Sequence, residues 1–415
     1  MDSRSLRLLD YFQVLHHLKG FARSEAGAQA CADLRPIHDR SVLEKELQEL
    51  REAVDAASEV LRAVTSFPDI HGVLSLLEQE SAVDEDGLWG LFVFLQAARQ
   101  AKRILSGLGP EQYTGLHARL CDLHWPERTW QGLNRCLDPE GGLKDESSPE
   151  LLSVRQEVRR MQSQCTKKVT DYLQQTGITP YLQDDYLTIS ADRYVLAIRS
   201  DFKGRLQGII HDYSQTGETC YFEPMLLVEL NNTLQELRQE EREARQRVLC
   251  MLSSLASQDR AALRSVFTWM VHIDVLQAKV RLAQALQGQD VQLGKGLPLC
   301  LQQACHPLLV LNGERVQPVN IELDSGQRGL IISGGNSGGK TVCLKTLGLI
   351  ALMALSALPT PVQAGSTLPL WDQILVFIGD EQNLQEHQST FTAQIEHFRS
   401  DWSRMDANSL VLLDE

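Results

Sequence analysis

Long apolar runs are missing from this sequence. The longest near-apolar stretches, Leu88–Ala98 and Leu347–Leu358, are shorter than the roughly 20 residues that a transmembrane helix needs. The N-terminus, Met1-Asp-Ser-Arg-Ser-Leu-Arg, also lacks the apolar core of a secretory signal peptide. We therefore expect a soluble protein that stays in the cytoplasm.

Paired cysteines are missing too. The nine cysteines are scattered, their number is odd, and no C-x-x-C pair occurs. This pattern argues against a disulfide framework and against a zinc site. Reduced thiols fit the expected cytoplasmic location.

Excess positive charge is also absent, because the chain has a net charge of −14. An evenly acidic chain would disfavour nucleic acid as a partner. However, residues 151–280 hold 16 basic and 16 acidic residues, so all the excess acid lies outside that segment. The composition therefore still allows a local basic face in the middle of the chain.

Residues 1–149 are predicted to form a helical core or lever domain. Apolar residues recur at helical spacing between Val42 and Leu61, after a Ser41-Val-Leu-Glu44 sequence that resembles a capping box. The segment 136–149 contains two prolines, two glycines and two serines, which is typical of a boundary.

Residues 150–286 are predicted to form long helical arms with a β-rich tip at about 181–222. A long polar helix is expected from about Glu150 to Gln175, and helices follow again after Glu223-Pro224. Between them the apolar period changes to two, and Ser190-Ala-Asp192 predicts a tight turn.

Two basic clusters in this segment have two interpretations each. They either solvate an exposed face or contact phosphates of a nucleic acid. The helix carries Arg155, Arg159 and Arg160, and the β-rich module carries Arg199, Lys203 and Arg205.

Residues 287–415 are predicted to form an α/β domain with a mostly parallel sheet, because strands alternate with helices. The expected strands are Gly329–Ile332, buried, Gln373–Ile378, and an apolar one, buried on both faces, that starts at Ser409 and leads into Asp414-Glu415. The expected helices are Thr341 to about Leu355 and one near Phe391–Met405.

A phosphate-binding loop joins the first of these strands to the first helix. The residues Gly334, Gly335, Asn336, Ser337, Gly338, Gly339, Lys340 and Thr341 fit the pattern G-x-x-x-x-G-K-[ST]. In such a loop, backbone N–H groups face the phosphates, the lysine contacts the β- and γ-phosphates, and the hydroxyl binds Mg²⁺. The alternative is a glycine-rich turn with a chance lysine, which the strand-loop-helix context disfavours.

Acidic residues at strand ends complete a candidate nucleotide site. Asp414 is expected to hold Mg²⁺ through water, and Glu415 is expected to orient the attacking water. Asp380 follows the strand Gln373–Ile378 and is a further candidate for the metal. Ser389 either caps the next helix or faces a nucleotide bound by a partner subunit.

Together these residues resemble the MutS family of DNA-repair ATPases. The matching segments are Cys305-His306-Pro307-Leu308-Leu309, Gly334–Thr341, Ile378-Gly-Asp-Glu-Gln382, Ser389-Thr-Phe391 and the final Leu-Leu-Asp-Glu. The segments Phe202–Gly217 and Phe222–Asn232 resemble the bacterial type-two branch, a recombination suppressor that usually carries a Smr nuclease domain. Gly335 and Ser337 depart from the family pattern, which usually has proline, and threonine or methionine, at these positions.

The resemblance implies an ATPase with Mg²⁺ that forms a homodimer through its ATPase domains. It places His306 at the nucleotide and Ser389 against the nucleotide of the partner. The implied ligand is branched DNA, bound so as to suppress homologous recombination. Two alternatives are a ribosome-associated ATPase that rescues stalled or collided ribosomes by contacting rRNA, and a non-catalytic nucleotide-binding fragment.

The sequence as given also leads to an expectation about turnover. Asp414 and Glu415 are its last residues, so Glu415 carries an additional α-carboxylate, and a chain terminus tends to fray. Further family elements, including a nuclease domain, are expected only in a longer chain. We therefore expect this chain to bind ATP but to hydrolyse it very slowly.

Overall fold

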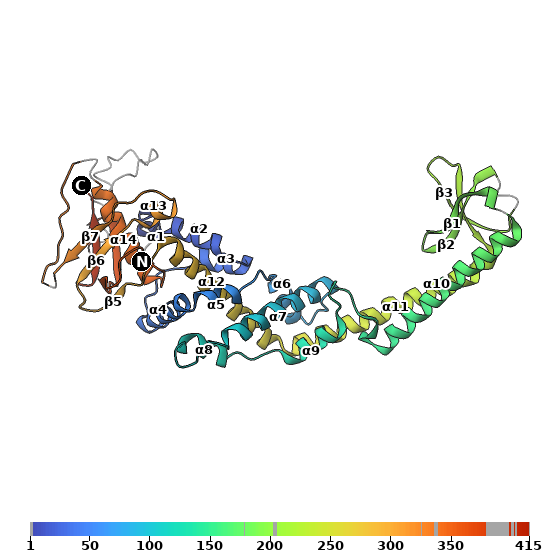
Figure 1. Cartoon of the computed structure of the whole chain (residues 1–415), viewed down its shortest axis with the longest axis horizontal. Helices are drawn as coiled ribbons and strands as arrows, with labels where there is room; N and C mark the ends of the chain where they lie inside the picture. Colours follow the sequence, from blue (N-terminus) through green and yellow to red (C-terminus); the bar gives the residue numbers. More distant parts are fainter. Residues whose placement is uncertain are drawn as a thin grey trace. The chain divides into compact units, whose positions relative to one another are not determined.

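A computed structural model describes residues 3–177, 179–201, 206–324, 326–335, 339–378, 398–399, 402 and 405–414. The chain divides into two compact units (Figure 1). The first comprises Met1–Ile70, Val93–Trp125 and Ala261–Glu415, and the second comprises His71–Phe92 and Pro126–Arg260. The expected domain boundaries at 149 and 286 stay predictions. No helix in the described part of the chain is long and apolar enough to cross a bilayer.

The first unit combines helices with two small sheets. Its helices are α1 (Ser3–Leu8), α2 (Tyr11–Phe21), α3 (Glu25–Ala32), α4 (Arg40–Asp55), α5 (Ala57–Ala63), the second half of α7 (Glu85–Leu105), α8 (Thr114–Cys121), α12 (Arg260–Leu286), α13 (Pro307–Leu311) and α14 (Lys340–Leu355). Its strands are β5 (Gln292–Gly294), β6 (Leu299–Ala304), β7 (Val319–Leu323), β8 (Thr367–Pro369), β9 (Gln373–Phe377) and β10 (Ser409–Leu413).

The start of α4 differs from the predicted capping box. Asp39 is the N-cap residue, and its carboxylate accepts hydrogen bonds from the N–H groups of Ser41 and Val42. Ser41 and Glu44 lie inside the helix. An aspartate is as good a cap as a serine, and here it lies two residues nearer the N-terminus.

The predicted mostly parallel sheet is wrong in two respects. Strands β9 and β10 form a parallel pair by themselves, while the other sheet has the order β5-β8-β6-β7 and contains antiparallel pairs. Residues 329–332 are not a strand: Ile331 is 92% exposed and Leu330 is 48% exposed. A strand needs a hydrogen-bonded neighbour, and no described strand pairs with this run. Its apolar residues therefore remain uncovered.

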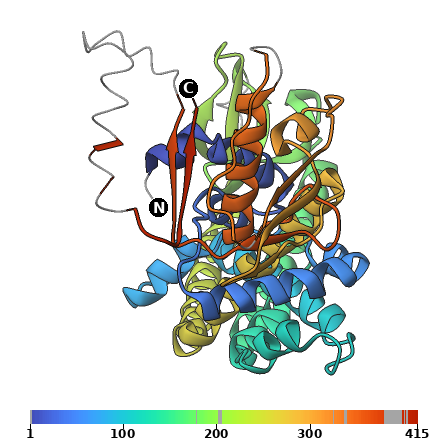
Figure 2. The same ribbon diagram turned by 90° about the vertical axis from the view of Figure 1, so that its left-hand side faces the viewer.

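Helix α14 is the central element of the core of the first unit. Every residue from Thr346 to Leu355 is buried, and α14 lies beside the β9–β10 pair in Figure 2. The packing is close at Gly348, where an added Cβ would lie 2.5 Å from Leu412 of β10 and 2.7 Å from Leu9. The predicted helix from Thr341 to about Leu355 is confirmed.

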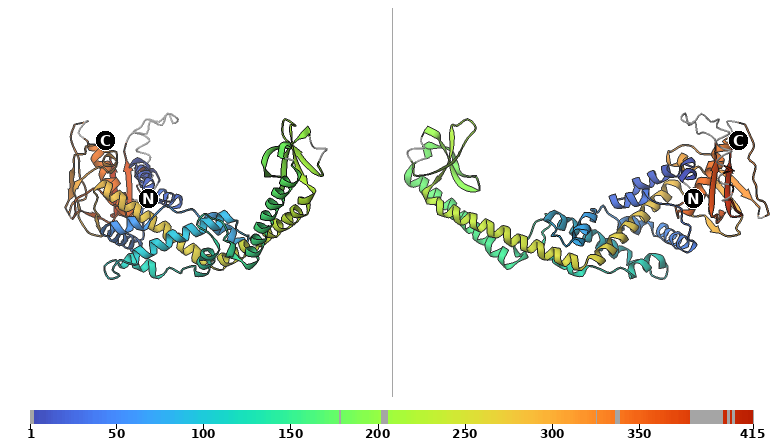
Figure 3. Two further views of the ribbon diagram at one scale, coloured as in Figure 1. Left: turned by 45° about the vertical axis from the view of Figure 1, so that its right-hand side comes forward. Right: turned by 180° about the vertical axis from the view of Figure 1, so that it is seen from behind.

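The second unit is built on two long helices that run side by side (Figure 3). Its elements are α6 (His71–Glu78), the first half of α7, α9 (Glu127–Cys136), the 3-10 turns Asp145–Ser147 and Thr179–Tyr181, α10 (Pro149–Thr176), β1 (Leu182–Ser190), β2 (Arg193–Arg199), β3 (Gly208–Tyr213), β4 (Thr219–Pro224) and α11 (Met225–Gln258). Strand order is β1-β2-β4-β3, and every pair is antiparallel. Ala191 and Asp192 form the predicted tight turn with φ values of 49° and 62°.

A buried carboxylate attaches this sheet to α11. Glu223 of β4 is fully buried and pairs with Arg193 of β2 at 2.9 Å and with His211 of β3. The amide of Asn231 on α11 donates to the same carboxylate at 2.7 Å. Burial raises the pKa of Glu223, but these partners outweigh burial and hold the pKa below its usual value. One side chain therefore connects three strands and a helix.

Candidate nucleotide-binding site

The N-terminus of α14 carries the phosphate-loop motif. Gly339 is its N-cap residue and has a φ of 75°, a left-handed conformation that glycine adopts without strain. Gly339 has no side chain that could cap the helix, and the N–H groups of a helix's first turn have no partner within the helix itself. A helix start with these properties attracts anions.

Lys340 and Thr341 are the first two residues of α14. The ammonium of Lys340 donates to the carbonyl of Gly334, the first residue of the motif, at 2.9 Å. Gly335 is exposed next to it. Asn336, Ser337 and Gly338 lie outside the described residues.

Thr341 and Asp414 come together from distant positions in the sequence. The Thr341 hydroxyl donates to the Asp414 carboxylate at 2.7 Å, although 73 residues separate them. The position of Asp414 is fixed by β10, because its N–H donates to the carbonyl of Phe377 in β9 at 3.0 Å. A hydroxyl and a carboxylate are both oxygen ligands of the kind that Mg²⁺ prefers. The donor set therefore fits this ion, and the predicted Mg²⁺ roles of Thr341 and Asp414 stay predictions.

The strand that leads to Asp414 is less buried than predicted. Leu412 faces the core at 4% exposure, whereas Val411 and Leu413 are 38% and 60% exposed. Side-chain exposure alternates along the strand because, in the described structure, one face of β10 is covered and the other is open. Asp380, Ser389 and Glu415 lie outside the described residues, so their predicted roles stay predictions.

His306 lies at the start of α13 and is buried. Its Nδ1 has no hydrogen-bond partner among the described residues. Burial lowers its pKa, while the carboxylate of Asp10 acts in the opposite direction and Lys345 adds to the decrease. The predicted contact of His306 with nucleotide stays a prediction. The two charged residues that act on it, Asp10 and Lys345, form an ion pair at the second turn of α14.

The ion pair Asp10–Lys345 was missed by the sequence analysis. Lys345 lies five residues after Lys340, and its ammonium is 2.9 Å from Asp10, with both side chains 29% exposed. Asp10 lies between α1 and α2 with a φ of 58°. Nearby, the buried Tyr11 hydroxyl donates to Ser356 at 2.7 Å, and burial raises the pKa of Tyr11 to about 12. These contacts connect the N-terminal helices to both ends of α14.

The predicted basic clusters differ in their surroundings. Arg155 pairs with Asp145 and Glu241, Arg159 pairs with Asp145, and Arg160 pairs with Glu157. This pairing favours a structural role for the helix cluster. Arg199 is exposed at the end of β2. Lys203 and Arg205 lie outside the described residues.

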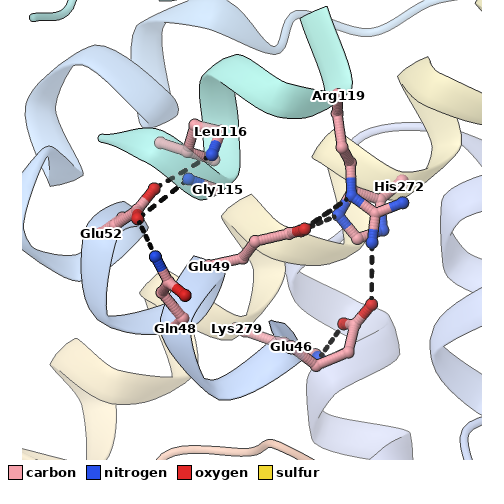
Figure 4. A network of polar contacts seen from close by, with 9 residues as sticks. All are labelled: Glu46, Gln48, Glu49, Glu52, Gly115, Leu116, Arg119, His272 and Lys279. Atoms are coloured by element: carbon pink, nitrogen blue, oxygen red, sulfur yellow. Dashed lines mark hydrogen bonds and ion pairs between the residues drawn. The ribbon is translucent and has the colours of Figure 1, made fainter. Parts of the chain in front are cut away.

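One further group of side chains has the composition of a metal site. Glu46, Glu49 and His272 bring ligand atoms within 4.8 Å of one another. Figure 4 shows why they suit a structural role better: Arg119 contacts both glutamates, at 3.0 and 2.8 Å, and Lys279 lies 3.6 Å from Glu46. The two cations already balance the carboxylates, and the network joins α4, α8 and α12.

Known protein families give an independent comparison. A family model called MutS domain V matches residues 330–415. A protein of Maridesulfovibrio salexigens called endonuclease MutS2 is 44% identical over 416 residues, which cover all of this chain and 54% of that relative. Proteins with the same name from Solidesulfovibrio magneticus and Aquifex aeolicus are 47% and 31% identical over 418 residues, again with 54% of each covered.

The chain thus spans about half the length of the curated relatives it matches. Similarity to them extends over the whole chain, while the family model matches the part that contains the phosphate loop, Thr341 and Asp414. The expected relationship is confirmed: the chain belongs to the MutS family, in the type-two branch that these relatives represent.

Proposed function

We propose that the chain binds ATP with Mg²⁺ at the N-terminus of α14. The contact between Thr341 and Asp414 is the single observation that carries this proposal. Two oxygen ligands for a cation lie next to a helix start that attracts anions, so one site suits both the metal and the phosphates. When bound, Mg²⁺ would neutralise phosphate charge.

The remaining roles follow from the family pattern. Lys340 contacts the β- and γ-phosphates, Glu415 orients the attacking water, and Asp380 supports the metal. Ser389 acts on the nucleotide of a partner subunit in a homodimer formed through the ATPase domains. The α/β part of the chain would then be an ATPase domain of the P-loop type.

The direct test of this site uses Lys340→Ala. Removing the ammonium removes a charged contact with the phosphates and should abolish binding of a fluorescent ATP analogue. A matched control is Lys295→Ala, which removes an exposed turn lysine far along the chain from the loop. If Lys340→Ala leaves the affinity unchanged, the nucleotide site is assigned wrongly.

For the whole protein we propose an ATP-dependent DNA clamp that binds branched DNA and suppresses homologous recombination. Membership of the MutS family supports DNA as the ligand, and the relatives are called endonucleases. Arms made of α10 and α11 with the β1–β4 sheet at one end suit a clamp.

The alternative ligand is the ribosome, contacted through rRNA during rescue. The two ligands can be separated by binding at several salt concentrations to a four-way junction, a linear duplex of equal length and purified ribosomes. The DNA-clamp proposal predicts tighter binding to the junction, which weakens as salt rises. A preference for ribosomes over the junction would reverse the assignment. If the chain binds nucleotide but neither the junction nor ribosomes, the alternative of a non-catalytic nucleotide-binding fragment remains.

A further inference from the structure

The first unit contains an open groove that the phosphate-loop site does not use. It encloses about 660 Å³ and lies between the Arg23 turn, α5 with the loop after it, and α7. Its polar lining includes Arg23, Arg62, Ser66 and Gln100. None of its lining residues belongs to the phosphate loop, β9 or β10. A volume of this size lies in the usual range for small-molecule sites.

The backbone of Arg23 is fixed by a fully buried carboxylate. Asp274 of α12 accepts hydrogen bonds from the N–H groups of Arg23 and Ser24, each at 2.9 Å, and from the Ser24 hydroxyl at 2.6 Å. The amide of Gln277 donates to the same carboxylate at 3.0 Å. The turn that presents Arg23 to the groove is therefore rigid. Preorganisation of this kind reduces the entropic cost of binding a ligand.

The guanidinium of Arg23 brings positive charge to the groove. It has no ion-pair partner among the described residues, and Arg281 lies close to it. Burial lowers the pKa of Arg281, and the charge of Arg23 lowers it further, while Asp274 has the opposite effect. Arg62, which also lines the groove, contacts Glu59 at 3.2 Å in a largely exposed pair. Such pairs contribute little, so Arg62 can turn to an anion at small cost.

The floor of the groove is apolar. Val64 is buried, Leu61 and Ile104 are half-buried, and Gln100 also lines the groove. A ligand that matches these groups needs an anionic part for the two arginines. It also needs an apolar part for Leu61 and Ile104, with polar edges for the amide of Gln100. Arginine pairs well with phosphate because its planar fork binds two oxygens. A nucleotide combines these three features.

We propose that this groove binds a free nucleotide, with Arg23 and Arg62 on its phosphates and its base against the half-buried side chains of Leu61 and Ile104. The chain would then hold a second nucleotide, separate from the one at α14. This inference does not require the proposed site at α14 to be correct, because no residue is shared. The ligand class is a nucleoside phosphate.

The test uses the full chain with Lys340→Ala, so that binding at the phosphate loop is removed. We expect equilibrium dialysis with radiolabelled ADP to show one bound equivalent. The added changes Arg23→Ala and Arg62→Ala should each lower the affinity about tenfold, in line with the loss of one charged hydrogen bond. Arg40→Ala, which removes an exposed arginine that pairs with Glu44, should have no effect.

A second set of measurements distinguishes the contribution of the phosphates from that of the base. Inorganic pyrophosphate should compete with ADP, and its affinity should fall with Arg23→Ala but not with Gln100→Ala. Thermal unfolding of each variant shows whether it is folded. Lack of ADP binding by the Lys340→Ala chain would overturn the proposal, and so would ADP binding that ignores both arginines. If a short single-stranded oligonucleotide binds through these arginines and ADP does not, the proposal is wrong and the ligand of the groove is nucleic acid.

Discussion

At the scale of single residues, the surroundings of His306 lead to a prediction about pH. Burial lowers the pKa of His306, Asp10 opposes this decrease and Lys345 adds to it. Removing the carboxylate with Asp10→Asn should therefore lower the pKa further, whereas Lys345→Met should raise it. NMR titration of the His306 imidazole in each variant measures the direction. Shifts of the same sign in both variants would show that the two charges do not act on His306.

Close packing at Gly348 gives a second prediction. An added methyl group would lie 2.5 Å from Leu412 and 2.7 Å from Leu9. Overpacking of this kind costs about 1–3 kcal/mol, which exceeds the gain of about 1 kcal/mol from replacing a helical glycine. Gly348→Ala should therefore lower the free energy of unfolding, as measured by urea titration.

The matched control is Gly20→Ala in α2, where nothing lies within 4 Å of the added carbon. This change should leave stability unchanged or raise it by up to about 1 kcal/mol. Equal destabilisation by both substitutions would contradict the packing described for α14.

Single residues also show which contacts a sequence reveals. The pattern around Lys340 and Thr341 identified the loop, and the acidic end of an apolar run identified Asp414, because both motifs follow from local chemistry. Asp10 belongs to no local pattern. Its contact with Lys345 depends on how two distant helices pack, so only the structure could identify it.

At the scale of elements, the network around Glu49 connects α4, α8 and α12 and predicts an acid dependence. Burial raises the pKa of Glu49, but His272 and Arg119 outweigh burial and hold it below the usual value. A depressed pKa stabilises the folded state above the unfolded value of about 4.3. This contribution is lost as the pH falls through the folded pKa.

Glu49→Gln should therefore destabilise the chain at pH 7, by about 1–3 kcal/mol for groups left without a buried partner. The difference in free energy of unfolding between Glu49→Gln and the parent should shrink as the pH falls below about 4. Chemical denaturation at pH 7 and at about pH 3, below the unfolded pKa of a glutamate, measures it. Glu44→Gln, at an exposed position of α4, is the control and should change little. A difference that stays constant with pH would contradict the role of the carboxylate charge.

Strand predictions succeeded where an apolar run has a neighbour. The segments Gln373–Phe377 and Ser409–Leu413 pair in register as β9 and β10. The run 329–332 is equally apolar but has no described partner and stays exposed. Hydrophobicity identifies the tendency to form a strand, whereas the neighbour that completes the hydrogen bonds is a property of the whole fold. The predicted helix near Phe391–Met405 lies mostly outside the described residues.

At the scale of the whole molecule, the distribution of charge predicts where nucleic acid binds. The segment from about 150 to 285 is close to neutral in an otherwise acidic chain. It should therefore crosslink to DNA more readily than residues 1–135. Photocrosslinking followed by peptide mapping locates the contacts. Crosslinks confined to the first 135 residues would overturn this assignment.

The central claim is that Thr341 and Asp414, which lie far apart in the sequence, form one site for ATP and Mg²⁺. ATP affinity should be measured with Mg²⁺ and with EDTA for the parent, Thr341→Val, Asp414→Asn and the double variant. The account predicts that Mg²⁺ strengthens binding by the parent, and that each single change removes most of this effect. The double variant should then lose little more, because the two oxygens act on the same ion. Unchanged Mg²⁺ dependence in both single variants would contradict the account.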